Sequence, residues 1–374
     1  MCDKQGNSRN DANIHPHERD LGPLGWDATW AEAFDHCARQ ARDARVQPGR
    51  VIAVRRGLCD LATAGGTCLA SFSGRLSHQT VSGADLPVTG DWVAWRGQPG
   101  AGELQIESVL PRRTCLIRKA PGAVDGQPLV ANVDWVWLVS SMNRDWNPAR
   151  LERYLTLVWE SGARPVVVLT KADLHPDPDE IVEQAEAVAF GTPIHPVSVM
   201  TGEGLDALAA YLQPGKTVAL LGSSGVGKST LTNHLLDADR QATLAVRASD
   251  QRGRHTTTSR ELFRLPNGAM VIDTPGLREL ALWQGDEALE QVFADVEDLA
   301  RRCRFRDCRH ESEPGCAVLD AVAGGELAQR RLDSYRKVKK ELLRHEELQT
   351  LQGRMARKQR EKALGKLIRD FSNR

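Results

Sequence analysis

Short alternations of hydrophobic and polar residues, divided by glycines, characterise the segment from Gly49 to Ala120. Residues 50–54, 67–70 and 91–95 are its strand candidates. Several short strands separated by turn residues within about 70 residues predict a small β-barrel. An oligonucleotide-binding barrel (OB-fold) is the specific prediction, and a β-rich packing module without a ligand is the alternative.

From Asn132 onwards, nearly continuous apolar runs alternate with stretches of helical spacing. The runs predict buried strands at 135–139, 165–169, 194–198, 217–221 and 270–272. Helices are expected between them, at 149–160 and 180–189. Apolar strands that alternate with helices indicate an α/β domain with a mostly parallel sheet, covered on both faces. After Asp286 the pattern is helical.

These changes of pattern divide the chain into an N-terminal extension with one short helix (1–48), an OB-fold (49–120), an α/β domain (121–285), a helical domain (286–335) and a basic helical tail (336–374). The composition, 41% hydrophobic and 26% charged, is that of an ordinary globular protein. No apolar run approaches the roughly 20 residues of a membrane span, and the polar N-terminus offers no secretory signal. We therefore expect a cytoplasmic monomer without a membrane partner.

The formal net charge of zero conceals a basic C-terminal part. Residues 326–374 hold 15 Lys and Arg against 7 Asp and Glu, a net charge of +8, which suggests a polyanionic partner. Apolar residues in this part have helical spacing: Leu332, Tyr335, Val338, Leu342, and then Leu364, Leu367, Ile368 and Phe371. A packed helix with a solvated basic face and an arm that follows an RNA backbone are the two alternatives.

A complete phosphate-loop motif, G-x-x-x-x-G-K-[S/T], follows the apolar run 217–221 and opens a helix. Its residues are Gly222, Ser223, Ser224, Gly225, Val226, Gly227, Lys228, Ser229 and Thr230. The glycines let backbone N–H groups converge on a β-phosphate, and the helix N-terminus adds a favourable dipole. We expect catalytic Lys228 to bridge the β- and γ-phosphates and the Ser229 hydroxyl to ligate Mg²⁺.

The apolar run 165–169 ends in a guanine-recognition motif, Thr170, Lys171, Ala172 and Asp173. The Asp173 carboxylate can accept from the guanine N1–H and 2-amino groups together, and adenine offers no such pair of donors. Lys171 would lay its alkyl stem along the base. Thr170 stands where Asn is usual, so we expect a weaker tethering hydrogen bond there.

Two further loops are expected to complete the nucleotide site. Ser198 and Val199 follow the next strand and are candidates for the backbone contact to the guanine O6, with an ordinary helix cap as the alternative. Asp273 and Gly276 form D-x-x-G, in which Asp273 would hold Mg²⁺ through water and the Gly276 N–H would sense the γ-phosphate. Our preferred additional Mg²⁺ ligand is Thr257, in a switch-like loop for which a solvated threonine loop is the alternative.

Leu277 occupies the place where many GTPases carry the Gln that orients the attacking water. His255 is the nearest candidate for positioning that water or acting as a base, with a structural switch histidine as the alternative. Slow turnover alone and stimulation by a large partner are expected. Because the guanine motif precedes the phosphate loop, the reverse of the usual order, the domain is expected to be circularly permuted. Such a rearrangement leaves the contacts of the fold unchanged.

A Cys₃His set, the closed donor set of a structural zinc site, lies beyond the α/β domain at Cys303, Cys308, His310 and Cys316. A disulfide explanation would leave one cysteine over, and unligated cysteines are the alternative. Arginines surround the set at 301, 302, 304, 306 and 309, which favours a surface for RNA phosphates.

Together these motifs resemble the RsgA (YjeQ) family of ribosome-dependent GTPases, over roughly Arg50 to Tyr335. The resemblance implies an N-terminal OB-fold, a circularly permuted P-loop GTPase domain that uses GTP or GDP with Mg²⁺, and a C-terminal helical domain with one Zn²⁺. It further implies late maturation of the small (30S) ribosomal subunit as the function. The subunit, its 16S rRNA and other assembly factors would be the partners.

Two other functions stay open at this point. The first is an RNA-binding zinc protein that keeps GTP as a structural ligand, which the missing glutamine at Leu277 makes conceivable. The second is an ATP-dependent kinase, which would require Asp173 to be incidental.

Overall fold

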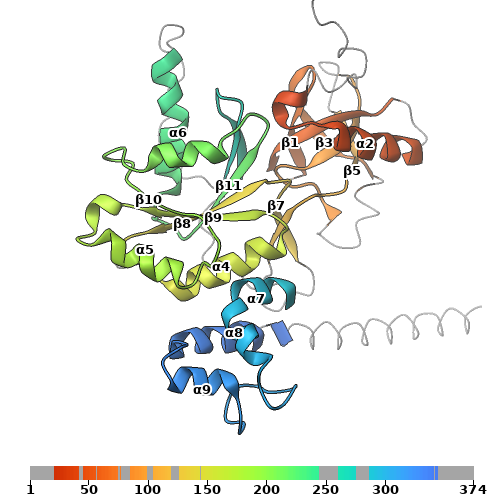
Figure 1. The fold of residues 1–374 in the computed structure, drawn as a ribbon. Helices are drawn as coiled ribbons and strands as arrows, with labels where there is room; N and C mark the ends of the chain where they lie inside the picture. The colour runs from red at the N-terminus through yellow and green to blue at the C-terminus, as the bar shows by residue number, and fades with distance from the viewer. Residues whose placement is uncertain are drawn as a thin grey trace, which may run out of the picture.

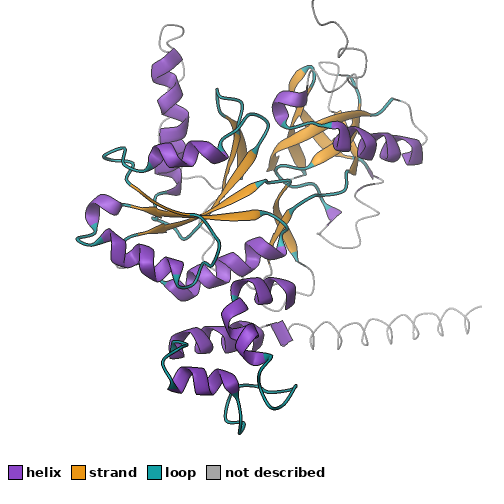
Figure 2. Ribbon diagram, in the orientation of Figure 1, coloured by secondary structure: helices purple, strands orange, loops and turns teal. Residues whose placement is uncertain are grey.

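The computed structural model describes residues 21–41, 45–55, 57–74, 76, 85–98, 104–118, 126–143, 145–243, 260–274, 286–340 and 342–343. Three parts follow one another along the chain: a β-barrel, an α/β sheet and a helical module that lies against one side of the α/β domain (Figure 1). Figure 2 shows that the described strands belong to the first two parts and that the third is helical.

The α/β sheet contains five parallel strands. Their order is β10 (Ile194–Val197), β9 (Arg164–Thr170), β8 (Trp135–Ser141), β11 (Thr217–Leu221) and β13 (Met270–Asp273). All five runs predicted as strands are confirmed. Four of them are buried almost throughout, as continuous apolar residues require, whereas β10 at the edge of the sheet is only partly buried. A sixth strand, β12 (Glu261–Arg264), pairs antiparallel with β13 and was not predicted. Its four residues are too few for a periodic signal.

Helices α4 (Pro148–Glu160), α5 (Pro178–Glu186) and α6 (Lys228–Thr243) belong to this part. The side chain of Asn147 caps α4 by accepting from the Arg150 N–H at 3.1 Å. Asp177 caps α5 in the same way at 3.4 Å, which moves the start of that helix to Pro178, two residues before the expected position. Short 3₁₀ turns, η4 (Ala172–Leu174) and η5 (Leu205–Tyr211), follow β9 and β10.

The barrel consists of β1 (Gln47–Arg55), β2 (Leu58–Thr63), β3 (Gly66–Phe72), β4 (Trp92–Arg96) and β5 (Leu104–Val109). They pair in the order β1-β2-β3-β5-β4, and β4 returns to β1. This closed five-stranded order confirms the predicted OB-fold. A two-stranded ladder, β6 (Cys115–Arg118) with β7 (Gln127–Ala131), follows it. Ala53 of β1 pairs with Glu261 of β12, so the barrel and the α/β sheet form one continuous 11-stranded sheet.

The N-terminal segment packs onto the barrel. It contains η2 (Gly22–Leu24) and α2 (Ala28–Ala41). Trp26 and Trp30 are each 4% exposed, and their rings lie 4.8 and 6.1 Å from Trp92 of β4. Large aromatic side chains bury much apolar area, so this contact anchors the segment to the barrel core.

The helical module contains α7 (Asp286–Val292), α8 (Ala294–Ala300), α9 (Ala317–Ala323) and a further helix over residues 329–340. In this last helix Leu332, Tyr335 and Val338 are buried, and the Tyr335 ring lies 5.5 Å from Phe293. The packed-helix alternative is therefore confirmed here, whereas the apolar positions from Leu364 to Phe371 lie outside the described residues. No helix among the described residues is long and apolar enough to cross a membrane.

Candidate nucleotide site and metal centre

The predicted nucleotide loops meet at one edge of the sheet. Each follows the carboxyl end of a parallel strand: the guanine motif follows β9, Ser198 follows β10, the phosphate loop follows β11, and Asp273 ends β13. Because these four strands are parallel, their carboxyl ends lie on the same edge. Ligands of open α/β sheets bind at this edge.

The phosphate loop has the backbone that its glycines predict. A Cβ on Gly222 would lie 2.2 Å from the Val139 carbonyl oxygen, so a larger residue does not fit. Gly225 and Gly227 have φ of +83° and +99°, which L side chains rarely adopt. Lys228, 6% exposed, donates from Nζ to the carbonyl oxygens of Gly222 and Ser223 at 2.8 Å each. Two of its three N–H groups therefore hold the ammonium in place, and one is left for phosphate oxygens.

Ser229 and Asp273 form a donor set that fits Mg²⁺. The Ser229 hydroxyl donates to Oδ2 of Asp273 at 3.2 Å. Asp273 is 4% exposed, and its Oδ1 has no hydrogen-bond partner among the described residues. Burial raises the pKa of this carboxyl, while the Ser229 hydrogen bond and the charge of Lys228 lower it. A hard divalent cation would supply the missing partner and favour the ionised carboxylate.

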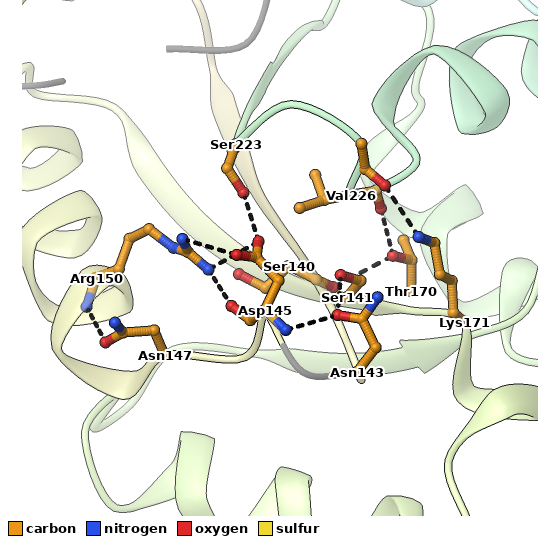
Figure 3. A network of polar contacts seen from close by, with 12 residues as sticks. Ser140, Ser141, Asn143, Asp145, Asn147, Arg150, Thr170, Lys171, Ser223 and Val226 are labelled. Atoms are coloured by element: carbon orange, nitrogen blue, oxygen red, sulfur yellow. Dashed lines mark hydrogen bonds and ion pairs between the residues drawn. The ribbon is translucent and has the colours of Figure 1, made fainter. Parts of the chain in front are cut away.

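The guanine motif is tied directly to the phosphate loop, as Figure 3 shows. The Thr170 hydroxyl donates to the Val226 carbonyl oxygen at 2.5 Å, and Nζ of Lys171 donates to the Gly225 carbonyl oxygen at 2.9 Å. Threonine at this position therefore makes its own hydrogen bond to the phosphate loop. Lys171 has a φ of +61°, which turns the chain at the end of β9 so that exposed Asp173 follows in η4.

The loop after β10 is a tight turn around buried Ser198. Its N–H donates to the Glu203 carbonyl oxygen at 2.9 Å, and its hydroxyl accepts from the Thr201 N–H at 3.2 Å. Gly204, with a φ of +73°, is required because a Cβ there would lie 2.1 Å from the Pro196 carbonyl oxygen. Since the Ser198 N–H is used within the turn, the Val199 N–H is the better of the two candidates for the guanine O6.

Four residues that the sequence places in or beside the switch region lie outside the described residues. This holds for His255, Thr257, Gly276 and Leu277. Their assigned roles therefore stay predictions.

The four predicted zinc ligands converge in the helical module, with all ligand atoms within 4.8 Å of one another. Cys303 Sγ lies 3.8 Å from Cys316 Sγ, and the His310 Nδ1 lies 3.6 and 3.4 Å from these two sulfurs. A tetrahedral Zn²⁺ with Zn–S of about 2.3 Å and Zn–N of about 2.0 Å requires S···S of about 3.8 Å and S···N of about 3.5 Å. Three of the ligand atoms therefore have the spacing of a tetrahedral zinc site, and the four residues together have the composition of a closed one.

Glu313 holds the chain between the last two zinc ligands. Its carboxylate accepts from the backbone N–H groups of Arg309 and Glu311 at 2.8 Å and of Ser312 at 3.0 Å. These hydrogen bonds, the one from Arg309 first, lower the pKa of Glu313 to about 2. The hydrogen bonds of Glu313 therefore help to fix the conformation of the loop that carries the ligands, in addition to any bound metal.

Sequence analysis did not identify two polar contacts that involve α4. Asp145, just before this helix, accepts from the Ser223 hydroxyl of the phosphate loop at 2.9 Å. Buried Glu152, on the helix, pairs with Arg331 of the helical module at 2.6 Å. The position of Asp145 after a buried strand was an available signal for the first contact. The second joins residues 179 positions apart, and no local pattern indicates it.

Comparisons with known proteins identify a family for this chain. The RsgA GTPase family model matches residues 109–283. The chain is 46% identical over 331 residues to the small ribosomal subunit biogenesis GTPase RsgA of Streptomyces coelicolor, covering 87% of this chain and 88% of that protein. It is 47% identical over 331 residues to the protein of the same name from Opitutus terrae, covering 86% and 89%.

Two solved structures are also similar. The crystal structure of YjeQ from Thermotoga maritima matches with a TM-score of 0.57 and 29% identity, over 80% of this chain and 99% of that one. YloQ, described as a circularly permuted GTPase, matches with a TM-score of 0.55 and 25% identity, over 80% and 96%. The permuted order of motifs, the strand-end site and these similarities lead to one conclusion: this chain belongs to the RsgA GTPase family.

Proposed function

We propose that this GTPase acts in the late maturation of the small ribosomal subunit, binds its rRNA and hydrolyses GTP when the subunit stimulates it. The similarity to proteins named for small-subunit biogenesis, over 87% of the chain, is the observation that carries this proposal. The family assignment argues against GTP as a mere structural ligand and against an ATP-dependent kinase.

The helical module offers a surface of the required charge. Five arginines near the zinc-ligand cluster are exposed: Arg301, Arg302, Arg304, Arg306 and Arg309. Phe305 among them is 43% exposed, and the Arg304 guanidinium lies 5.5 Å from its ring. Exposed arginines contact phosphates, and exposed aromatic rings stack on unpaired bases. We propose that this surface contacts 16S rRNA, with the barrel and the basic tail as further contact regions.

In the proposed reaction Asp173 selects guanine, and the loop from Gly222 to Thr230 holds the phosphates through backbone N–H groups. Lys228 stabilises the charge that develops on the β- and γ-phosphate oxygens. Mg²⁺, held by Ser229 and Asp273, supplies further positive charge to these oxygens. His255 is proposed to position the attacking water, since Leu277 has no polar atom that could do so.

GTP turnover is expected to rise by at least roughly 100-fold when isolated small ribosomal subunits are added. The reason is that a catalytic group supplied or repositioned by a partner raises the rate of a GTPase by about 10³–10⁵. Phosphate release measured with small subunits, with large subunits and with neither tests this. Equal rates in all three mixtures would remove the ribosomal part of the proposal. Equal stimulation by large subunits would remove its specificity.

Replacing Lys228 with Ala should lower kcat/KM for GTP by about 10²–10³, because one charge-assisted donor to the phosphates is lost. The matched control is Lys216→Ala at the other end of β11, where the ammonium is half-exposed and pairs with Asp134 at 2.9 Å. Stimulated turnover of both variants is the measurement. A Lys228→Ala protein as active as the control would contradict the assigned role.

A further inference from the structure

The start of α4 is attached to the phosphate loop. Oδ2 of Asp145 accepts from the Ser223 hydroxyl at 2.9 Å and lies 2.9 Å from the Arg150 guanidinium, which also donates to the Asp145 carbonyl oxygen. Arg150 belongs to the first turn of α4, whose cap is Asn147. The dashed contacts in Figure 3 run from this first turn through Asp145 to Ser223. A shift of α4 along its axis would therefore move the Asp145 carboxylate. This movement would change the hydrogen bond that the carboxylate accepts from the Ser223 hydroxyl.

The same helix is attached to the helical module by a buried ion cluster. Arg331 is 4% exposed and donates to Oε1 of Glu152 at 2.6 Å, to both carboxylate oxygens of Asp295 at 2.8 and 3.0 Å, and to the Val292 carbonyl oxygen at 2.5 Å. Glu152 is 2% exposed, and its other oxygen has no partner among the described residues. Because a buried carboxylate without its cation is costly, α4 and the module are expected to move together.

Apolar packing makes this attachment rigid. Leu151, Leu155 and Val158 of α4 belong to the same buried cluster as Phe293 and Tyr335 of the module. Well-packed side chains transmit displacement because the interior has little free volume. Figure 1 shows α4 lying between the sheet that carries the nucleotide loops and the blue helical module.

We propose that α4 couples the helical module to the phosphate loop, with Arg331 as the contact at one end and Asp145 as the positioning residue at the other. A partner that displaces the module would change the hydrogen bond between Asp145 and Ser223. The affinity of the phosphate loop for the nucleotide would change as a result. This inference rests on the proposed function of the site as a GTP switch. In this inference, α4 is the element through which a contact made near the zinc cluster would affect the binding of the nucleotide phosphates.

The test measures the affinity of isolated full-length protein for a fluorescent N-methylanthraniloyl-GDP. Arg331→Lys keeps the charge but loses the planar fork that binds Glu152 and Asp295 together. It is expected to change the dissociation constant by roughly 2- to 30-fold, the range of couplings between distant sites. In a Ser223→Ala background, which removes the hydroxyl that donates to Asp145, the same substitution should change affinity by less than about 2-fold.

Arg330→Lys is the matched control, because Arg330 precedes Arg331 on the same helix of the module but is exposed. Glu152→Gln, which keeps the volume and an acceptor for Arg331, repeats the test if Arg331→Lys proves unstable. Zinc content and melting temperature identify variants that are folded. A folded Arg331→Lys protein with unchanged affinity, or with an equal change in the Ser223→Ala background, would overturn the coupling. Since no ribosomal subunits are present, neither outcome depends on whether subunits stimulate hydrolysis.

Discussion

Cys316→Ser is expected to lose bound zinc almost completely and to melt at a temperature lower than the unsubstituted protein by roughly 10 °C or more. Cys316 is 2% exposed, and its sulfur lies 3.8 Å from Cys303 Sγ and 3.4 Å from the His310 imidazole, so it occupies a central place in the donor set. Structural zinc contributes about 10–16 kcal/mol of apparent free energy in zinc-finger peptides. This module also has an apolar core around Tyr335, so we expect only part of that contribution, on the order of 5 kcal/mol, to be lost.

Metal analysis and thermal unfolding of the purified protein measure both effects. The control is Cys68→Ser in β3 of the barrel, a half-buried thiol outside the cluster. This variant should keep about one zinc per chain. A zinc-to-protein ratio near zero in the unsubstituted protein would refute the site itself, and full zinc in Cys316→Ser would refute the ligand set.

The motifs at strand ends could be predicted because each depends on a few neighbouring residues. A buried strand gives a continuous apolar run, and the loop after it carries its functional residues in sequence, as with Thr170 to Asp173 after β9. Parallel pairing then brings the loops together without further information. The Cys₃His cluster follows the same logic, since its four ligands lie within one short loop region.

Contacts between distant segments could not be predicted. The pairing of β1 with β12 depends on Ala53 meeting Glu261, and the four residues of β12 carry no signal for that register. Arg331 stands in a segment whose composition indicates a solvated basic face, yet it is buried between two carboxylates. Likewise, the contact of Trp26 and Trp30 with Trp92 depends on tertiary packing, and no local pattern in the N-terminal extension indicates it.

The circular permutation, together with the contact between Arg331 and α4, gives the helical module two attachments to the nucleotide domain. In this order of motifs, β13 leads from Asp273 towards α7, so the metal-binding end of the nucleotide site and the helical module are neighbours in the chain. The module returns to the domain at α4 through Arg331. It is thus attached to the nucleotide domain both by the chain after β13 and by the buried ion cluster. In the coupling that we propose, a contact made by the module would act on β8 and β13, the two strands that flank β11 and its phosphate loop.

Asp173→Asn is expected to shift the nucleotide preference from GTP to xanthosine triphosphate by a total of about 10³–10⁴-fold. In its predicted role, the carboxylate would accept from both N1–H and the 2-amino group of guanine. An amide can accept only the first of these and presents its NH₂ to the second, whereas xanthine has a carbonyl oxygen at that position. Asp173 is exposed in η4, next to Lys171, whose Nζ is fixed on the Gly225 carbonyl oxygen at 2.9 Å. The substitution therefore changes base recognition without removing a tether of the phosphate loop.

Competition of GTP and xanthosine triphosphate against a fluorescent guanine nucleotide measures the change. Asp179→Asn makes the same chemical change on an exposed acid in the first turn of α5 and should keep the preference for GTP. Melting temperatures of both variants should match that of the unsubstituted protein, because neither carboxylate is buried. If Asp173→Asn still prefers GTP as strongly as the control does, Asp173 does not read the base. The preference for guanine over xanthine would then have to come from another group that contacts the base at its 2-position, because a backbone N–H such as that of Val199 would contact only O6, which both bases carry.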